Sequence, residues 1–367
     1  MASIFKQLTN LFSGSSGGAD TSNGVVGIEF SAGSVKVVQL RESSGAPVLE
    51  TYGELALGPY DDKPVGVAVK PSPEVLGGAL NDILKEADVT TAAAGVSIPI
   101  SASLVNIINL PPVSDQDKLA EIIPIEARKY IPVAPSEVLM DWDILPGGDG
   151  RQDHPQQALV VAIHKEAIDR YRQALAVTDL DIGFFEIEIF SSIRATLDSG
   201  IEPVLLVDLG ISSSKIYIVE HGVVRGSHTI NQGGQDITHS LASQLGISFD
   251  EAEKLKHQEG LIGDGDDADA VRESSRTVLN YVFSKTNDIM VDYQKQNASV
   301  IEEAVLTGGG AIFSGIDTIA EEMLGIKTRQ AHPFSKLKTP AFLDDTLRRI
   351  GPEFAVSIGA ALRRLQE

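Results

Sequence analysis

The chain has 367 residues, 43% of them hydrophobic, which is enough to bury a sizeable core and suits two or three domains. Its formal charge of −21 repels nucleic acid and anionic lipid, so we expect neither to be a main partner. Cysteine is absent, which excludes disulfides, thiolate catalysis and zinc–sulfur sites, and no apolar run reaches the roughly 20 residues that would span a bilayer.

The N-terminal region divides into a short helix and a linker. Apolar residues at helical spacing predict an amphipathic helix over residues 1–12, and the glycine- and serine-rich residues 13–24 are typical of a flexible tether. Such a helix docks on a membrane surface or a partner, or else packs nowhere. Because Lys6 is its only basic residue, we expect any membrane association to come mainly through partners.

The first half of the remaining chain alternates strands and helices. Residues 25–40 predict a strand, a glycine–serine turn and a second strand. A serine at position 114 can cap a helix that runs to about Tyr130, with a kink at Pro124. The other predicted elements are a helix at 74–87, strands near 93–98, 104–110, 138–145 and 157–164, and a helix containing Ile168, Tyr171 and Leu175.

The second half repeats the order of strand, hairpin and helices. Strands followed by helices throughout the chain predict an α/β fold. The predicted elements are strands at 203–208, 215–220 and 222–230, helices at 235–245 and 250–258, a long helix after the acidic loop 263–269, a strand running into a glycine turn at 303–310 and followed by a helix, and an amphipathic helix at 353–366.

An internal duplication is the strongest signal. When residues 27–38 are aligned with 207–217, Glu29 matches Asp208 and Lys36 matches Lys215. In each copy an acid ends an apolar strand, and a lysine follows seven positions later, after a turn of small residues. These turns contain Ser31, Ala32, Gly33 and Ser34 in the first copy and Gly210, Ser212, Ser213 and Ser214 in the second. Two copies, each opening one half, predict duplicated domains with a cleft between them.

The chemistry of such a pair suits a polyphosphate. Small residues let the backbone turn tightly, so that its N–H groups converge on an anion. The acids Glu29 and Asp208 can hold Mg²⁺ through water, because this ion keeps much of its hydration shell. The alternative is that both segments are ordinary hairpins whose acids cap the turns.

Further glycine clusters favour a nucleotide. Gly308, Gly309 and Gly310 follow a predicted buried strand, where a base and ribose could lie against bare backbone, and Gly233 and Gly234 precede a predicted helix. One helical turn separates Glu253 from Lys256, which could face the ribose or base together. In isolation that pair would be an exposed ion pair.

At the level of these motifs a family resemblance is plain. The segments GIEFSAGSVKVVQL, LVDLGISSSKIYIVEHG, GGQDIT…EAEKLK and VLTGGGAIFSGID resemble the phosphate-1, phosphate-2, nucleotide-side helix and adenosine motifs of the actin/chaperone ATPase superfamily. Within it, the chain is similar to the type IV pilus assembly PilM family from about Val25 to Arg364, including the Tyr130-Ile131-Pro132 step of that family's inserted subdomain. The cell-division protein FtsA is similar in architecture.

The resemblance implies an actin-like α/β fold of two ribonuclease-H-like domains, with ATP and Mg²⁺ in the cleft and an inserted α+β subdomain. The implied boundaries are 25–101 and 183–202 for the first domain, 102–182 for the insertion, 203–340 for the second domain, and 341–367 for a segment that packs back on the first. The resemblance assigns nucleotide contacts to the turns, lysines and glycines named above and to Glu253, Lys256 and Ala311. It assigns metal binding to Glu29 and Asp208.

The implied role is that of a cytoplasmic adaptor, peripheral to the inner membrane. PilM-like proteins bind the N-terminal cytoplasmic peptide of the membrane protein PilN and link the PilN/PilO complex to the pilus motor. We expect the peptide groove beside the inserted subdomain, near the apolar residues of 114–131. Pilus motor ATPases and a homo-oligomer stay open as further partners. The alternatives are an FtsA-like filament-forming ATPase and a small-molecule kinase of the same superfamily.

Two departures from the family pattern G-I-D-I-G-S-S bear on hydrolysis. Glu29 replaces the aspartate and would push a metal outward, and Ser31 replaces a glycine, which would cost about 1 kcal/mol if the position needs a positive φ. We therefore expect nucleotide binding with weak or no hydrolysis. Glu188 could orient a water molecule, although a glutamate here could also simply start a helix.

Overall fold

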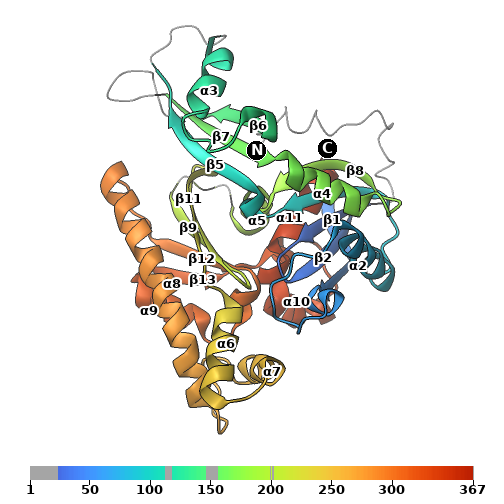
Figure 1. The fold of residues 1–367 in the computed structure, drawn as a ribbon, viewed down its shortest axis with the longest axis vertical. Coiled ribbons are helices and arrows are strands. Elements are labelled where there is room, and N and C mark those ends of the chain that lie inside the picture. Colours follow the sequence, from blue (N-terminus) through green and yellow to red (C-terminus); the bar gives the residue numbers. More distant parts are fainter. Residues whose placement is uncertain (1–23, 112–117, 146–155, 199, 201, 367) are drawn as a thin grey trace.

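The structure is a computed structural model that describes residues 24–111, 118–145, 156–198, 200 and 202–366. The helix predicted for residues 1–12, the linker up to residue 23 and the predicted cap at position 114 lie outside these ranges. The described chain forms three sheets (Figure 1). No helix within the described ranges is long and apolar enough to cross a membrane.

The first sheet has the strand order β3-β2-β1-β4-β8. Its first three strands form an antiparallel meander, whereas β1, β4 and β8 are parallel to one another. All six residues of β1 are buried, as expected of a central strand covered on both faces. The strands are β1 (Val25–Phe30), β2 (Ser34–Ser43), β3 (Ala46–Ala56), β4 (Ala93–Ile98) and β8 (Asp181–Ile187).

The second sheet repeats this arrangement strand for strand. Its order is β11-β10-β9-β12-β13, again with an antiparallel meander of three strands and a parallel set of three that share β9. The duplication predicted from the two hairpins is therefore confirmed. The strands are β9 (Val204–Leu209), β10 (Ser214–Glu220), β11 (Val223–Ile230), β12 (Glu303–Thr307) and β13 (Lys327–Gln330).

The third sheet belongs to the insertion and has the antiparallel order β5-β7-β6. Its strands are β5 (Ser103–Asn109), β6 (Val138–Ile144) and β7 (Gln157–His164). Helix α3 (Leu119–Ala127) contributes to the small core of this sheet, contains Pro124 and ends before the predicted limit at Tyr130. The chain rejoins the first sheet at Asp181, two residues before the predicted return at 183.

Helices surround the two large sheets (Figure 1). In the first half, α2 packs on β2, β3 and α4, while α11 packs on β1 and β4. In the second half, Ser248 starts α7 with a capping box, in which its hydroxyl and the Glu251 carboxylate satisfy each other's backbone N–H groups. The helices are α2 (Pro73–Glu86), α4 (Lys165–Leu175), α5 (Glu188–Thr196), α6 (Gly234–Leu245), α7 (Phe249–Glu259), α8 (Ala268–Asn297), α9 (Ile316–Leu324), α10 (Asp344–Ile350) and α11 (Ala355–Gln366).

A packed interface joins the halves. Buried side chains of the second sheet, among them Leu206, Tyr217 and Val305, belong to the same apolar cluster as the core of the first half. Four elements are absent from the sequence-based prediction: β3, β8, β13 and α10. β13 reads KTRQ and carries no apolar run, so its pairing with β12 defines it as a strand.

Candidate functional site

The two hairpins have the same register at their acidic ends. Glu29 lies opposite Lys36 across β1 and β2, and Asp208 lies opposite Lys215 across β9 and β10. Both acids are buried, with 8% and 6% of their surface exposed. The equivalence seen in the sequence thus extends to the strand pairing.

Both hairpin turns line one cavity of about 770 Å³. Ala311, which was also predicted, is not among the lining residues, because its side chain is fully buried in the core of the second half. The predicted residues that line the cavity are Glu29, Ser31, Ala32, Gly33, Ser34, Lys36, Glu188, Asp208, Gly210, Ser212, Ser213, Ser214, Lys215, Gly233, Gly234, Glu253, Lys256, Gly308, Gly309 and Gly310.

The first turn is closed by a serine side chain. The Ser31 hydroxyl oxygen accepts the N–H of Ser34 at 2.9 Å and that of Gly33 at 3.3 Å. Neither Ser31 nor Gly33 has a positive φ. The strain expected at Ser31 is therefore absent, because the hydroxyl closes the turn that glycine would otherwise make by its backbone conformation.

Lys36 is held inside this hairpin. Its ammonium donates to the Ser34 hydroxyl at 2.8 Å and pairs with the Glu54 carboxylate at 3.0 Å. Burial lowers the pKa of Lys36, but the charges of Glu54 and Glu29 outweigh this and raise it overall. Glu54 lies directly opposite Lys36 on β3, and the sequence analysis missed it because that strand was not predicted.

Glu29 is an acid of the site whose carboxylate has an oxygen without a hydrogen-bond partner among the described residues. This oxygen is Oε2, and burial raises the pKa of the carboxyl to about 7. An unpaired carboxylate in such a position is costly, and a bound cation would relieve that cost. This atom therefore fits a metal ion in the cavity.

Lys215 joins the two halves at the floor of the site. Its ammonium lies 3.0 Å from Asp208 and 3.0 Å from Glu188, which starts α5. The Glu188 carboxylate also accepts the N–H of Ile100 at 2.9 Å, and burial raises the pKa of this carboxyl. Glu188 is thus fixed between a backbone amide and an ammonium, and it occupies the helix start that the sequence left open as its alternative role.

The triple glycine lies directly against Asp208. Gly308 has φ +83°, and a Cβ there would lie 2.2 Å from the Asp208 carboxylate, so any other residue would displace that carboxylate and strain the backbone. Thr307, the last residue of β12, lies opposite Asp208 in the sheet. Strand pairing therefore brings the glycine turn to the second hairpin.

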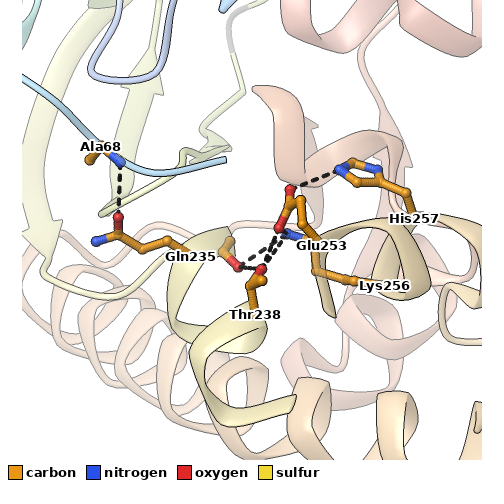
Figure 2. A network of polar contacts seen from close by, with 7 residues as sticks. Ala68, Gln235, Thr238, Glu253, Lys256 and His257 are labelled. Carbon is orange, nitrogen blue, oxygen red and sulfur yellow. Dashed lines mark hydrogen bonds and ion pairs between the residues drawn. The ribbon is translucent and has the colours of Figure 1, made fainter. Parts of the chain in front are cut away.

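Glu253 and Lys256 form the centre of a polar network between α6 and α7 (Figure 2). The Lys256 ammonium donates to Glu253 at 2.7 Å, to the Thr238 hydroxyl at 2.9 Å and to the Gly234 carbonyl at 3.2 Å. Burial would raise the pKa of Glu253, but His257 and Lys256 outweigh it and hold this pKa at about 2. The pair is not an exposed ion pair, and all three donors of Lys256 are used within the protein.

The charge of the cavity is strongly acidic. Six carboxylates line it, from Glu29, Glu54, Glu188, Asp208, Glu253 and Glu353, against the three lysines 36, 215 and 256. Burial, followed by the charge of Glu54, raises the pKa of Glu353 to about 7, which shows how crowded the acids are. A polyphosphate entering alone would be repelled, so an anionic ligand here needs a cation beside it.

The described residues hold no group of three or more His, Asp or Glu side chains arranged to bind a metal ion. Glu29 and Asp208 could supply two carboxylates, and Mg²⁺ commonly completes such a set with water and substrate phosphates. The residues missed by the sequence analysis, Glu54, Glu353 and His257, carry no local motif and reach the cavity only through the fold.

Solved structures share this fold. The structure of a PilM–PilN type IV pilus biogenesis complex matches with a TM-score of 0.78 at 22% identity, covering 94% of this chain and 99% of that one. MreB5 of Spiroplasma citri bound to AMPPNP matches with a TM-score of 0.51 at 14% identity, covering 92% and 95%. EutJ of Carboxydothermus hydrogenoformans gives 0.54 at 14%, covering 92% and 88%. The predicted actin-like fold is confirmed.

Curated relatives are cell-division proteins FtsA. That of Bacillus subtilis is 26% identical over 154 residues, which is 35% of this chain and 34% of that protein. That of Staphylococcus epidermidis is 23% identical over 142 residues, 34% of this chain and 31% of the relative. The chain thus spans about a third of the length of these relatives. The family model described as type IV pilus assembly protein PilM matches residues 27–365, nearly the whole chain, and the protein therefore belongs to the PilM family.

Proposed function

We propose that this protein is an ATP-binding adaptor of type IV pilus assembly that works in the cytoplasm at the inner membrane. It would hold the N-terminal cytoplasmic peptide of a PilN-like membrane protein and so link the PilN/PilO complex to the pilus motor. The observation that carries the nucleotide part is the pair of acid-tipped hairpins with equal register on one cavity. Family membership and the likeness to the PilM–PilN complex support the adaptor part.

The residues present suit a Mg²⁺–ATP complex. The hairpin turns offer backbone N–H groups to the phosphates, and Glu29 and Asp208 would hold the ion, Asp208 beside the glycine turn. An ammonium has three donors, and Lys36 and Lys215 each direct two at the protein, so each has a third for a phosphate oxygen. When bound, the ion neutralises phosphate charge in this acidic cavity.

The geometry favours slow or absent hydrolysis. A general base must accept a proton from an attacking water, and Glu188 is the predicted candidate. Its carboxylate already accepts from Ile100 and pairs with Lys215, so taking a proton would break the buried ion pair. The site can therefore bind and orient a triphosphate more readily than it can activate water.

Calorimetry of Mg²⁺–ATP binding tests the nucleotide claim. We expect the wild-type chain to bind and Asp208→Ala to bind at least about tenfold more weakly, the effect of losing ~1.4 kcal/mol or more from a charged contact. An unchanged dissociation constant in Asp208→Ala would remove this residue from the site. Phosphate release in single turnover measures hydrolysis, and sedimentation with ATP and a phosphate-transfer screen test the filament and kinase alternatives.

A synthetic peptide of the PilN-like N-terminus tests the adaptor claim. Two large apolar side chains of the insertion, Ile125 and Tyr130, are 59% and 48% exposed within the segment proposed to flank the groove. We expect Ile125→Asp to weaken peptide binding in fluorescence anisotropy, while Val300→Asp, which changes a 65% exposed apolar residue outside the insertion, between α8 and β12, leaves it unchanged. Failure of the wild-type chain to bind the peptide would refute the adaptor role.

A further inference from the structure

A segment of the first half reaches across the cavity to the second half. Residues 57–72, here called the strap, connect β3 to α2 and contribute Val65 and Gly66 to the cavity lining. The strap is fixed at its base, because the N–H of Leu57 donates to the Gly33 carbonyl and that of Val69 to the Ala32 carbonyl, both at 2.8 Å. It is therefore attached directly to the first hairpin turn.

Its far side is attached to the second half by one side chain. The N–H of Ala68 donates to the side-chain oxygen of Gln235 at 3.0 Å, across 167 positions of sequence (Figure 2). The backbone N–H of Gln235 in turn donates to the carbonyl of Ile211, in the second hairpin turn, at 2.8 Å. Gln235 thus ties the strap to the second turn.

These contacts close a ring around the proposed phosphate site. The two turns meet at Gly33, where a Cβ would lie 2.6 Å from the side chain of Ile211. Hydrogen bonds connect the first turn to the strap, the strap to Gln235, and Gln235 to Ile211. The side chain of Ile211 then packs against Gly33 of the first turn, which completes the ring. A ligand gripped by both turns would be enclosed by this ring.

The strap also rests on a rigid surface. Gly66 has φ +89°, and a Cβ there would lie 2.6 Å from the carboxylate carbon of Glu253. Glu253 cannot easily move away, because Thr238, Lys256 and His257 all bind its two oxygens (Figure 2). Glycine at this position is what lets the strap lie so close to α7.

We propose that the strap is a gate over the nucleotide cleft and that Gln235 is its latch, so that a nucleotide enters and leaves only after the bond between Ala68 and Gln235 opens. This inference rests on the proposed nucleotide binding. A single neutral hydrogen bond is a weak closure, which suits a gate that opens thermally and is biased by whatever ligand lies beneath it.

Stopped-flow measurements with the fluorescent analogue mant-ATP and Mg²⁺ test the gate. Because the latch holds the closed form with or without ligand, Gln235→Ala should raise both the association and the dissociation rate about fivefold, the factor that one such bond contributes, and change the dissociation constant far less. Gln235→Glu keeps an acceptor for the Ala68 N–H and should keep slow dissociation. The exposed Gln258 on α7 provides the control Gln258→Ala, which should match wild type.

A second variant perturbs the strap itself. Gly66→Ala should also raise both rates, because its Cβ would push the strap away from Glu253. Gly45→Ala is the matched control: Gly45 also has a positive φ, +70°, but nothing lies within 4 Å of a Cβ there. A rise in the dissociation rate alone would instead mark Gln235 as a ligand contact, and unchanged rates in both variants would overturn the gate.

Amide hydrogen exchange separates the gate from the nucleotide claim. The Ala68 amide should exchange slowly in wild type without ligand and faster in Gln235→Ala. A wild-type chain that binds no mant-ATP would refute the proposed nucleotide binding, and with it the gating role, whatever the Ala68 amide does. A chain that binds mant-ATP but whose Ala68 amide exchanges equally fast in both proteins would refute the latch and leave nucleotide binding intact.

Discussion

The adjacent residues Gly308 and Gly309 should differ sharply in their response to the same substitution, with Gly308→Ala destabilising the protein and Gly309→Ala leaving it almost unchanged. In Gly308→Ala the new Cβ would lie 2.2 Å from the Asp208 carboxylate and 2.7 Å from the Leu209 carbonyl, at φ +83°. A backbone at φ +83° and ψ 172° is open almost only to glycine and alone costs another residue about 1–3 kcal/mol, and the displaced carboxylate adds to this. In Gly309→Ala the nearest atom would be 3.9 Å away, so nothing must move.

Urea denaturation without nucleotide measures the difference. We expect Gly308→Ala to lower the free energy of unfolding by about 2 kcal/mol or more, and Gly309→Ala to change it by less than about 0.5 kcal/mol. Calorimetry with Mg²⁺–ATP should show weaker binding in Gly308→Ala, because the substitution displaces the carboxylate assigned to the metal. Equal stabilities for the two variants would refute the close packing of the glycine turn on Asp208.

Three further predictions concern the polar groups that hold the site together. Ser31→Gly, which restores the residue typical of the family, should destabilise the protein by about 1 kcal/mol in thermal denaturation, because it removes the hydroxyl that closes the turn; stabilisation would support backbone strain instead. Lys215→Met should cost about 3–5 kcal/mol by leaving Glu188 and Asp208 unpaired, and adding Glu188→Gln should recover part of it. The buried Glu186 is paired with Arg194 and Arg363, which lower the pKa of its carboxyl to about 2 despite burial. The stabilisation from this pairing is therefore complete above the ordinary glutamate pKa of 4.5 and should fall by about 3 kcal/mol in total as the pH drops toward 2. Urea denaturation at pH 5 and pH 3 should show this loss in wild type and not in Glu186→Gln.

The hairpins show how far local pattern carries a site prediction. Glu29 and Asp208 can be matched from the amino-acid sequence, because each acid, turn and lysine lies within one short segment whose strand pairing is local. Ser31 shows the limit of the same reasoning. A family pattern with glycine at this position predicts a positive φ, whereas the hydroxyl of this serine closes the turn with an ordinary backbone.

Site residues that come from separate elements could not be predicted from local sequence patterns. Glu54 faces Lys36 only because β3 joins the edge of the first sheet, and Glu353 reaches the cavity only because the segment after α10 lies against the glycine turn, where the Pro352 carbonyl accepts the N–H of Gly308. Ala311 was assigned to the site by its neighbours in sequence, but the 3₁₀ turn of Gly309–Ile312 directs it into the core.

The amino-acid sequence alone therefore determined the family, the α/β class, the duplication and the two hairpins, because each is encoded in contiguous residues whose hydrophobic period and turn composition act locally. The tertiary structure decided which charges meet in the cavity, that Glu188 is held by Lys215, and that the strap closes on Gln235. The bond between Ala68 and Gln235 alone joins residues 167 positions apart, and the geometry of all these contacts depends on strand order and on the packing of one half against the other, which no local pattern specifies.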